Sequence, residues 1–133
     1  MTASQTEQWA PVVDEFDPRF RIDESIVPGA GNGLFAEVLL PTGDCLEVIG
    51  VLVRAGSESD RCSHFADHHK FRIGDHLLIP LGYAGIVNHS ATPNMEKIVE
   101  GDRAYLRALR PIQVGEELFW QYSDYAQERF GFR

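Results

Sequence analysis

Glycine and proline divide this chain into short segments, and that division limits what it can fold into. The 133 residues include 12 glycines and 7 prolines. Between them lie short runs rich in Val, Ile, Leu, Phe and Tyr, which are residues enriched in strands. Such runs suit small sheets better than long helices. The sequence therefore predicts a β-dominated protein, mainly β with short helices, built from several small sheets.

Two β-hairpins are expected in the second half of the chain. Residues Lys70 to Ile73 and His76 to Pro80 flank a two-residue connection of the kind that hairpins use. Residues Met95 to Val99 and Arg103 to Leu109 flank a turn that contains Gly101. In the last of these segments apolar residues alternate with Tyr and Arg, as in a strand with one buried face. Further strands are expected at residues 20–27, 34–40 and 118–122.

The longest apolar run and the one expected helix precede these hairpins. Asp44 to Arg54 is rich in Val and Leu, so we expect it to form a central strand. Glu58 to His69 has a weak helical pattern, and we expect Cys62 and Phe65 to face inward there.

Length and charge limit the classes of protein to consider. A chain of this length suits one domain, so we expect a single domain with a short C-terminal tail at residues 19–133. It follows an N-terminal arm, residues 1–18, that packs Trp9 or Phe16 against it. The formal net charge of −8 argues against direct nucleic-acid binding, which needs clustered Lys and Arg.

The start of the sequence lacks the basic and apolar segments of a signal peptide, and no apolar run is long enough to span a membrane. The two cysteines are too few for a disulfide framework. These features predict a cytoplasmic protein, or a nuclear one if the source is eukaryotic.

A cluster of polar residues follows an apolar stretch near the middle of the second half. Asn88, His89, Ser90 and Asn94 come directly after apolar residues that would bury them. Buried polar groups are costly unless they are hydrogen-bonded. Taken alone, this segment is more often a hydrogen-bonded turn than a binding site, and both interpretations stay open.

Three segments together resemble the signature motifs of SET-domain protein lysine methyltransferases. They are Gly29 to Ala36 (GAGNGLFA), Asn88 to Asn94 (NHSATPN), and Gly115 to Leu118 (GEEL) followed by Tyr122. Their order and spacing are similar to those of the family, and the resemblance covers residues 20–125. Each motif is common singly, whereas all three in order are much more specific.

The resemblance implies a SET-like fold with a threaded, pseudoknot-like C-terminal segment, and S-adenosylmethionine as the cofactor. It assigns Gly31, Asn32 and Gly33 to the methionine end of the cofactor, where backbone without side chains allows a close approach. By the same resemblance, Asn88 contacts the amino-acid end and the backbone of His89 frames the adenine. An ordinary turn between strands is the alternative for the glycine segment.

Tyr122 corresponds to the tyrosine on which the family's reaction depends. A lysine amine has a pKa of about 10.4, so holding it uncharged at pH 7 costs roughly 4.6 kcal/mol. An apolar channel and the positive sulfonium of the cofactor both favour the uncharged amine. A phenol with an ordinary pKa of about 10 is a poor base at pH 7. We therefore expect Tyr122 to orient the amine while water takes the proton.

Four aromatic residues are candidates for the wall of the substrate channel: Trp120, Tyr125, Tyr83 and Phe71. For each of them singly, packing in the core is the stronger alternative. Trp120 departs from the family pattern, in which Phe or Tyr usually stands two residues before the tyrosine. Side-chain size at that position influences how many methyl groups are added, so the larger indole bears on both product and activity.

No metal site is expected. Met95 follows Asn94 where many family members carry a zinc-binding cysteine, and no Cys-rich tail follows. His64 and His68 have the spacing of two ligands on one helix face, but no further ligands with a recognisable spacing accompany them. Solvated surface is the stronger interpretation of these histidines.

The sequence thus predicts S-adenosylmethionine-dependent methylation of a lysine side chain on a protein. The acidic chain favours a basic, lysine-containing protein as the substrate. A second hypothesis is a SET-like module that binds the cofactor or a basic peptide without turnover, which the large Trp120 suggests. A third is a structural β-domain that binds neither.

Overall fold

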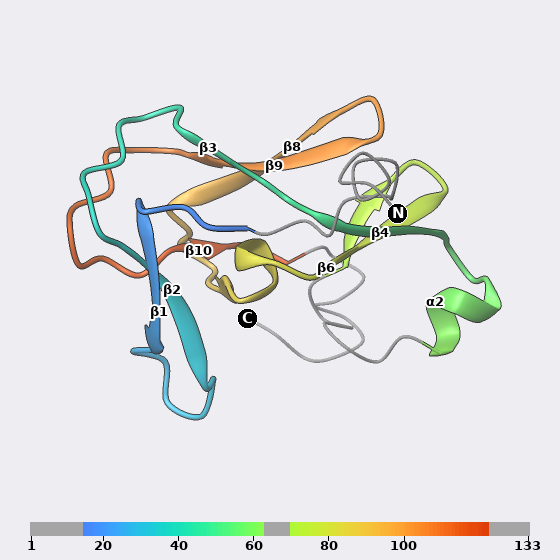
Figure 1. Cartoon of the computed structure of the whole chain (residues 1–133), viewed down its shortest axis with the longest axis horizontal. Coiled ribbons are helices and arrows are strands. Elements are labelled where there is room, and N and C mark those ends of the chain that lie inside the picture. The colour runs from blue at the N-terminus through green and yellow to red at the C-terminus, as the bar shows by residue number, and fades with distance from the viewer. Residues whose placement is uncertain (1–14, 63–69, 123–133) are drawn as a thin grey trace, which may run out of the picture.

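The computed structural model describes residues 15–62 and 70–122. Within them short strands dominate and form sheets of two or three strands each (Figure 1). The fold class expected from the sequence is therefore confirmed. Trp9, Phe65 and Tyr125, which were singled out above, lie outside these two ranges.

Three of the sheets in the described residues are antiparallel: β1–β2, β3–β9–β8 and β4–β6–β5. Their strands are β1 (Phe20–Glu24), β2 (Asn32–Ala36), β3 (Cys45–Glu47), β4 (Gly50–Arg54), β5 (Phe71–Ile73), β6 (His76–Pro80), β8 (Met95–Glu100) and β9 (Arg103–Ala108). The fourth sheet pairs β7 (Asn88–His89) with β10 (Phe119–Trp120) in parallel. The helical elements are α2 (Glu58–Cys62) and the 3-10 helix η2 (Tyr83–Gly85).

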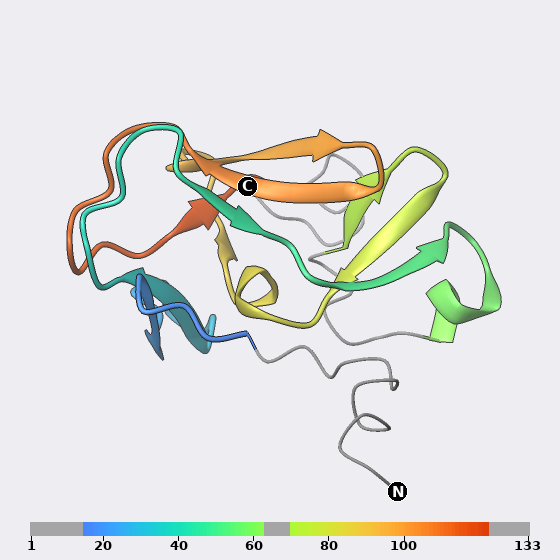
Figure 2. The same ribbon diagram turned by 45° about the horizontal axis from the view of Figure 1, so that its top comes forward.

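Buried apolar side chains from all four sheets form the core. Figure 2 shows the β1–β2 hairpin (blue) at the lower left and the β4–β6–β5 sheet (green to yellow) at the right of the molecule. Both expected hairpins are present, with Ile73 paired to His76 and Glu100 paired to Arg103 across their turns. The largest fully buried side chains include Phe71, Leu34, Leu40, Met95, Leu106, Ile112 and Leu118.

The segment that leads into β10 lies between β2 and β7. The Leu118 N–H donates to the Leu34 carbonyl at 2.8 Å, and the Ala36 N–H donates to the Glu116 carbonyl at 2.9 Å. Directly afterwards the chain pairs with β7. This segment therefore joins two parts of the chain that are far apart in sequence. The threaded segment expected from the resemblance would continue beyond residue 122, outside the described residues.

The prediction of one central strand at Asp44 to Arg54 was wrong. The run forms β3 and β4, which belong to different sheets, and β4 lies at an edge because it pairs with β6 alone. Leu46 is buried in the core, whereas Val51 on β4 is 50% exposed. One apolar run thus contributes a strand to each of two sheets, since β3 pairs with β9 and β4 pairs with β6.

The expectation that Cys62 faces inward was wrong, and of the two residues expected to pack the arm against the domain, Phe16 does not do so, while Trp9 lies outside the described residues. Cys62 is exposed, because the short polar helix α2 has no apolar face to bury. Phe16 is 79% exposed, because its neighbours Glu15 and Asp17 make the contacts between this segment and the rest of the protein.

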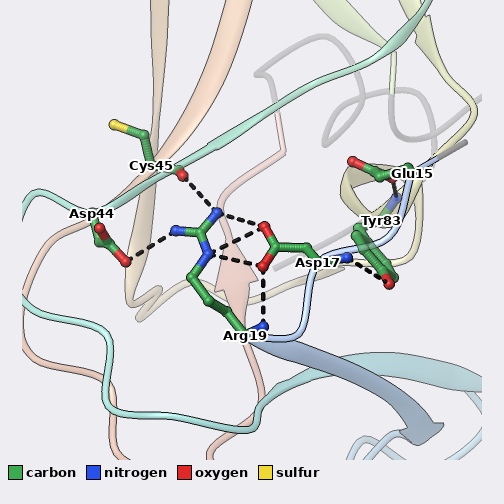
Figure 3. A network of polar contacts seen from close by, with 6 residues as sticks. All are labelled: Glu15, Asp17, Arg19, Asp44, Cys45 and Tyr83. Atoms are coloured by element: carbon green, nitrogen blue, oxygen red, sulfur yellow. Dashed lines mark hydrogen bonds and ion pairs between the residues drawn. The ribbon is translucent and has the colours of Figure 1, made fainter. Parts of the chain in front are cut away.

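Polar side chains fasten residues 15–19 to η2 and to the start of β3 (Figure 3). The Arg19 guanidinium contacts the Asp17 carboxylate at 2.7 Å and the Asp44 carboxylate at 3.0 Å. Glu15 accepts a hydrogen bond from the Tyr83 N–H at 2.6 Å. The hydrogen bonds from Arg19 hold the pKa of Asp17 below its usual value, whereas burial raises the pKa of Glu15.

We expect Gly50→Ala to lower the free energy of unfolding by about 2 kcal/mol. A Cβ at Gly50 would lie 1.9 Å from the Ile79 carbonyl oxygen, and backbone of a paired strand has little room to retreat. Urea unfolding measures the effect. Val51→Ala, at the exposed neighbouring position, is the control and should cost less than about 1 kcal/mol. Equal losses in the two variants would contradict this account of Gly50.

We expect Asp17→Asn to lower the free energy of unfolding at pH 7 by about 1 kcal/mol. Because the folded-state pKa of Asp17 is lowered, its contribution is present above the unfolded pKa of about 4 and is lost as the pH falls through the folded value. The gap between wild type and variant should therefore close at low pH. Urea unfolding between pH 7 and pH 2 tests this, with the exposed Asp23→Asn as the control.

Candidate active site

The parallel pair β7–β10 brings together two of the three sequence motifs. Asn88 is paired with Phe119 and His89 with Trp120. The Ser90 N–H continues the ladder by donating to the Trp120 carbonyl at 3.1 Å. Two segments about thirty residues apart in sequence thus lie side by side.

Tyr122 lies against His89, and its hydroxyl points toward Val87, the residue directly before the polar turn. Its N–H donates to His89 Nδ1 at 3.0 Å, and the two rings are 4.9 Å apart. Because Nδ1 accepts this bond, the neutral imidazole carries its proton on Nε2. The Tyr122 hydroxyl is 3.5 Å from the Val87 carbonyl oxygen. Burial raises the pKa of the Tyr122 phenol, so it is a protonated hydrogen-bond donor at neutral pH.

Trp120 and Phe71 extend this group into the core. Their rings stack at 4.3 Å with an interplanar angle of 6°, and the Trp120 ring lies 5.3 Å from that of Tyr122. Both side chains are buried, and the Trp120 Nε1 donor has no hydrogen-bond partner among the described residues. The structure thus places Trp120 beside the tyrosine and Phe71 against Trp120.

Tyr83 lies in different surroundings from Trp120 and Phe71. Its ring packs 5.9 Å from that of Phe20, and its hydroxyl accepts a hydrogen bond from the Asp17 N–H at 3.4 Å. It also lines a cleft of about 650 Å³. The described residues that line the cleft are Glu15, Ile22, Ile49, Gly50, Leu81, Gly82, Tyr83, Gly85 and Ile86. Tyr125 lies outside the described residues.

The glycine segment meets the polar turn directly. Gly31 has a φ of +76°, which favours glycine, and open space surrounds the position of its missing Cβ. The Asn32 carbonyl accepts a hydrogen bond from Asn88 Nδ2 at 3.0 Å. A Cβ at Gly33 would lie 2.2 Å from the Glu117 carboxylate. The absent side chain of Gly33 therefore makes room for a carboxylate of the protein itself, which is not the packing reason expected from the sequence.

Glu117 is a site residue that the sequence analysis missed. Its carboxylate is buried and accepts hydrogen bonds from Ser25 Oγ at 2.8 Å, the Ile26 N–H at 2.8 Å and Asn88 Nδ2 at 3.1 Å. Glu117 is the second glutamate of the GEEL motif, and that match was its one signal in the sequence. The resemblance assigned no role to this glutamate. The carboxylate connects the first strand's end, the polar turn and the third motif.

Asn94 supports the same arrangement from the other side of the turn. It is buried, and its Nδ2 donates to the Glu117 carbonyl at 2.9 Å. Its Oδ1 accepts from the Phe119 N–H at 2.8 Å. The last residue of the polar turn therefore holds the backbone on both sides of Leu118, which is a structural role.

The SET domain family model matches residues 31–123, which are most of the chain, so the protein belongs to the SET-domain family. Comparison with curated proteins gives no significant match. The family resemblance inferred from the three motifs is confirmed.

Two solved structures share the fold. One is a Plasmodium falciparum protein described as a candidate histone methyltransferase, with 19% identity and a TM-score of 0.64 over 82% of this chain and 96% of that chain. The other is a humanized mutant of the Chaetomium thermophilum Polycomb Repressive Complex 2 with an inhibitor bound. It has 25% identity and a TM-score of 0.67, and the match covers 79% of this chain and 15% of that one.

The described residues contain neither a cluster of metal ligands nor a membrane-spanning helix. No group of three or more His, Cys, Asp and Glu side chains in residues 15–62 and 70–122 is arranged to hold a metal ion. Over the same part of the chain, no helix has the length and hydropathy that crossing a membrane requires.

We expect the Tyr122 phenol to stay protonated at about pH 10, the ordinary pKa of a tyrosine phenol. The physical reason is burial, which disfavours the phenolate. Tyrosinate absorbance, followed upward from neutral pH while circular dichroism shows that the protein stays folded, measures the effect. Wild type and Tyr122→Phe should gain the same absorbance up to about pH 11. A smaller gain in the variant would contradict the expectation.

Proposed function

We propose that this protein is a protein-lysine N-methyltransferase that uses S-adenosylmethionine. The observation that carries the proposal is the convergence of the three motifs. Asn32 contacts Asn88, and His89 contacts Tyr122, each through a direct hydrogen bond. A glycine segment, a polar turn and a buried phenol are thus connected as a methyl-transfer site requires.

On this proposal the backbone at Gly31 and Asn32 and the polar turn at Asn88 and His89 hold the cofactor. S-adenosylmethionine, when bound, supplies an electrophilic methyl group on a sulfonium. Gly31 suits this role because the space around its Cα is open. Positioning of the two reactants accounts for most of the rate in such an in-line displacement.

Tyr122 orients the lysine amine. Its phenol keeps its proton at neutral pH and donates toward the Val87 carbonyl, so the phenol oxygen can accept a hydrogen bond from an amine N–H. The nitrogen lone pair is then free to attack the methyl group, and the amine's proton leaves to water. The Val87 carbonyl, 3.5 Å from the Tyr122 hydroxyl, is a second polar group at the same point. The buried rings of Trp120 and Phe71 make the surroundings apolar, which favours the uncharged amine.

We propose a basic, lysine-rich protein as the substrate. The formal net charge of −8 favours association with positively charged surfaces and disfavours nucleic acid. One of the similar structures is described as a candidate histone methyltransferase, and histones are proteins of this kind.

We expect Tyr122→Phe to lower methyl transfer by about 100-fold, because the variant loses one polar group aimed at the reacting atoms. Labelled S-adenosylmethionine and a mixture of basic proteins give the readout. Tyr105→Phe, on β9 where it pairs with Glu47 and Ile98, is the matched control and should keep full activity. Thermal unfolding checks that both variants are folded.

A binding module without turnover is the second candidate. The observation in its favour is Trp120, whose indole is buried against both Phe71 and Tyr122 and so occupies space beside the tyrosine. Calorimetry for cofactor binding, together with the methyl-transfer assay, distinguishes the enzyme from the binding module. Cofactor binding without transfer to any basic protein would favour the module and overturn the proposed enzyme.

A further inference from the structure

The carboxylate of Glu117 is enclosed by hydrogen-bond donors from distant parts of the chain. Glu117 is 4% exposed. Its Oε1 accepts from the Ile26 N–H at 2.8 Å, and its Oε2 accepts from Asn88 Nδ2 at 3.1 Å. Ser25 Oγ lies within hydrogen-bond distance of both oxygens. A buried carboxylate needs such donors, so the donors are held in place around it.

Glu117 and the Asn32 carbonyl together fix the side-chain amide of Asn88. Asn88 Nδ2 contacts the Asn32 carbonyl at 3.0 Å and Glu117 Oε2 at 3.1 Å, and both of these groups are acceptors only. The amide nitrogen must therefore face them, and the Asn88 Oδ1 faces the other way. Among the described residues no group donates a hydrogen bond to this oxygen.

We propose that Glu117 is a positioning residue that presents the Asn88 Oδ1 to a cationic donor, the amino group at the amino-acid end of S-adenosylmethionine. This inference rests on the proposed function, since it concerns how that cofactor is held. Oδ1 is a hydrogen-bond acceptor with no competing donor on the described protein surface. An ammonium group is the part of the cofactor that matches it chemically.

Gly33 belongs to the same device. Its missing Cβ would lie 2.2 Å from Glu117 Oε2, the oxygen that contacts Asn88. A side chain at Gly33 would push the carboxylate away from Asn88. The glycine motif, the asparagine of the polar turn and the glutamate of the third motif therefore depend on one another.

Glu117→Gln tests the inference because it keeps the shape and changes one acceptor into a donor. An amide nitrogen in the Oε1 position would face the Ile26 backbone N–H, which cannot turn. The side-chain amide of the introduced glutamine must therefore place its nitrogen toward Asn88 Nδ2, so that two donors face each other. The Asn88 side chain is then expected to turn and present its nitrogen to the cofactor.

Calorimetry with two probes gives the readout. S-adenosylhomocysteine carries the amino-acid end, and 5′-methylthioadenosine lacks it. Glu117→Gln should raise the Kd of S-adenosylhomocysteine by about 10-fold and change the Kd of 5′-methylthioadenosine by less than about twofold. Glu116→Gln, at the neighbouring position that faces Arg110 on the surface, is the matched control and should change neither.

The outcomes are distinguishable. Equal weakening of both probes would assign Glu117 a general structural role and overturn the inference, as would unchanged binding of both. Should Glu117→Gln not fold, Glu117→Asp keeps the charge but withdraws the carboxylate from Asn88 Nδ2, and it should likewise weaken S-adenosylhomocysteine alone. Failure of the wild-type protein to bind either probe would instead overturn the proposed function, and this inference with it.

Discussion

The buried carboxylate of Glu117 needs hydrogen-bond donors, and this need organises the part of the protein that contains the candidate site. Glu117 cannot be buried without donors, and the donors come from the end of the β1 region and from β7. Meeting that need fixes the distance between the β1–β2 hairpin and the polar turn. Removing a single partner would leave charge unsatisfied in the interior, so the groups around Glu117 stabilise one another as a set.

The small sheets are held together by chain segments that serve two of them at once. The segment before β10 bonds to β2 along one stretch and to β7 along the next. Asn94 holds the backbone on both sides of Leu118, so the change of partner occurs at a fixed point. Trp120 and Tyr122 follow directly after that point in the chain, so the fixed backbone there helps to place their rings. Phe71, from β5, stacks on Trp120.

Local features of the sequence predicted local structure well. Both hairpins were correctly placed, because a glycine turn between alternating strands specifies its own partner. The prediction of one strand at Asp44 to Arg54 was wrong because the apolar pattern of a segment does not indicate whether its two halves belong to the same sheet. The motif residues Asn88, His89 and Tyr122 were brought together as expected. Glu117 was missed because its meaning depends on Ser25, which is 92 residues away.

The long sequence separations within the site have a consequence for how it forms. The β5–β6 and β8–β9 hairpins join neighbouring segments, whereas the contacts of Asn88 with Asn32 and of Glu117 with Ser25 close loops of 56 and 92 residues. Loop-closure entropy opposes such contacts until most of the chain is ordered. The hairpins can therefore form early in folding, while the cofactor-side geometry is among the last parts to assemble and exists only in the complete native state.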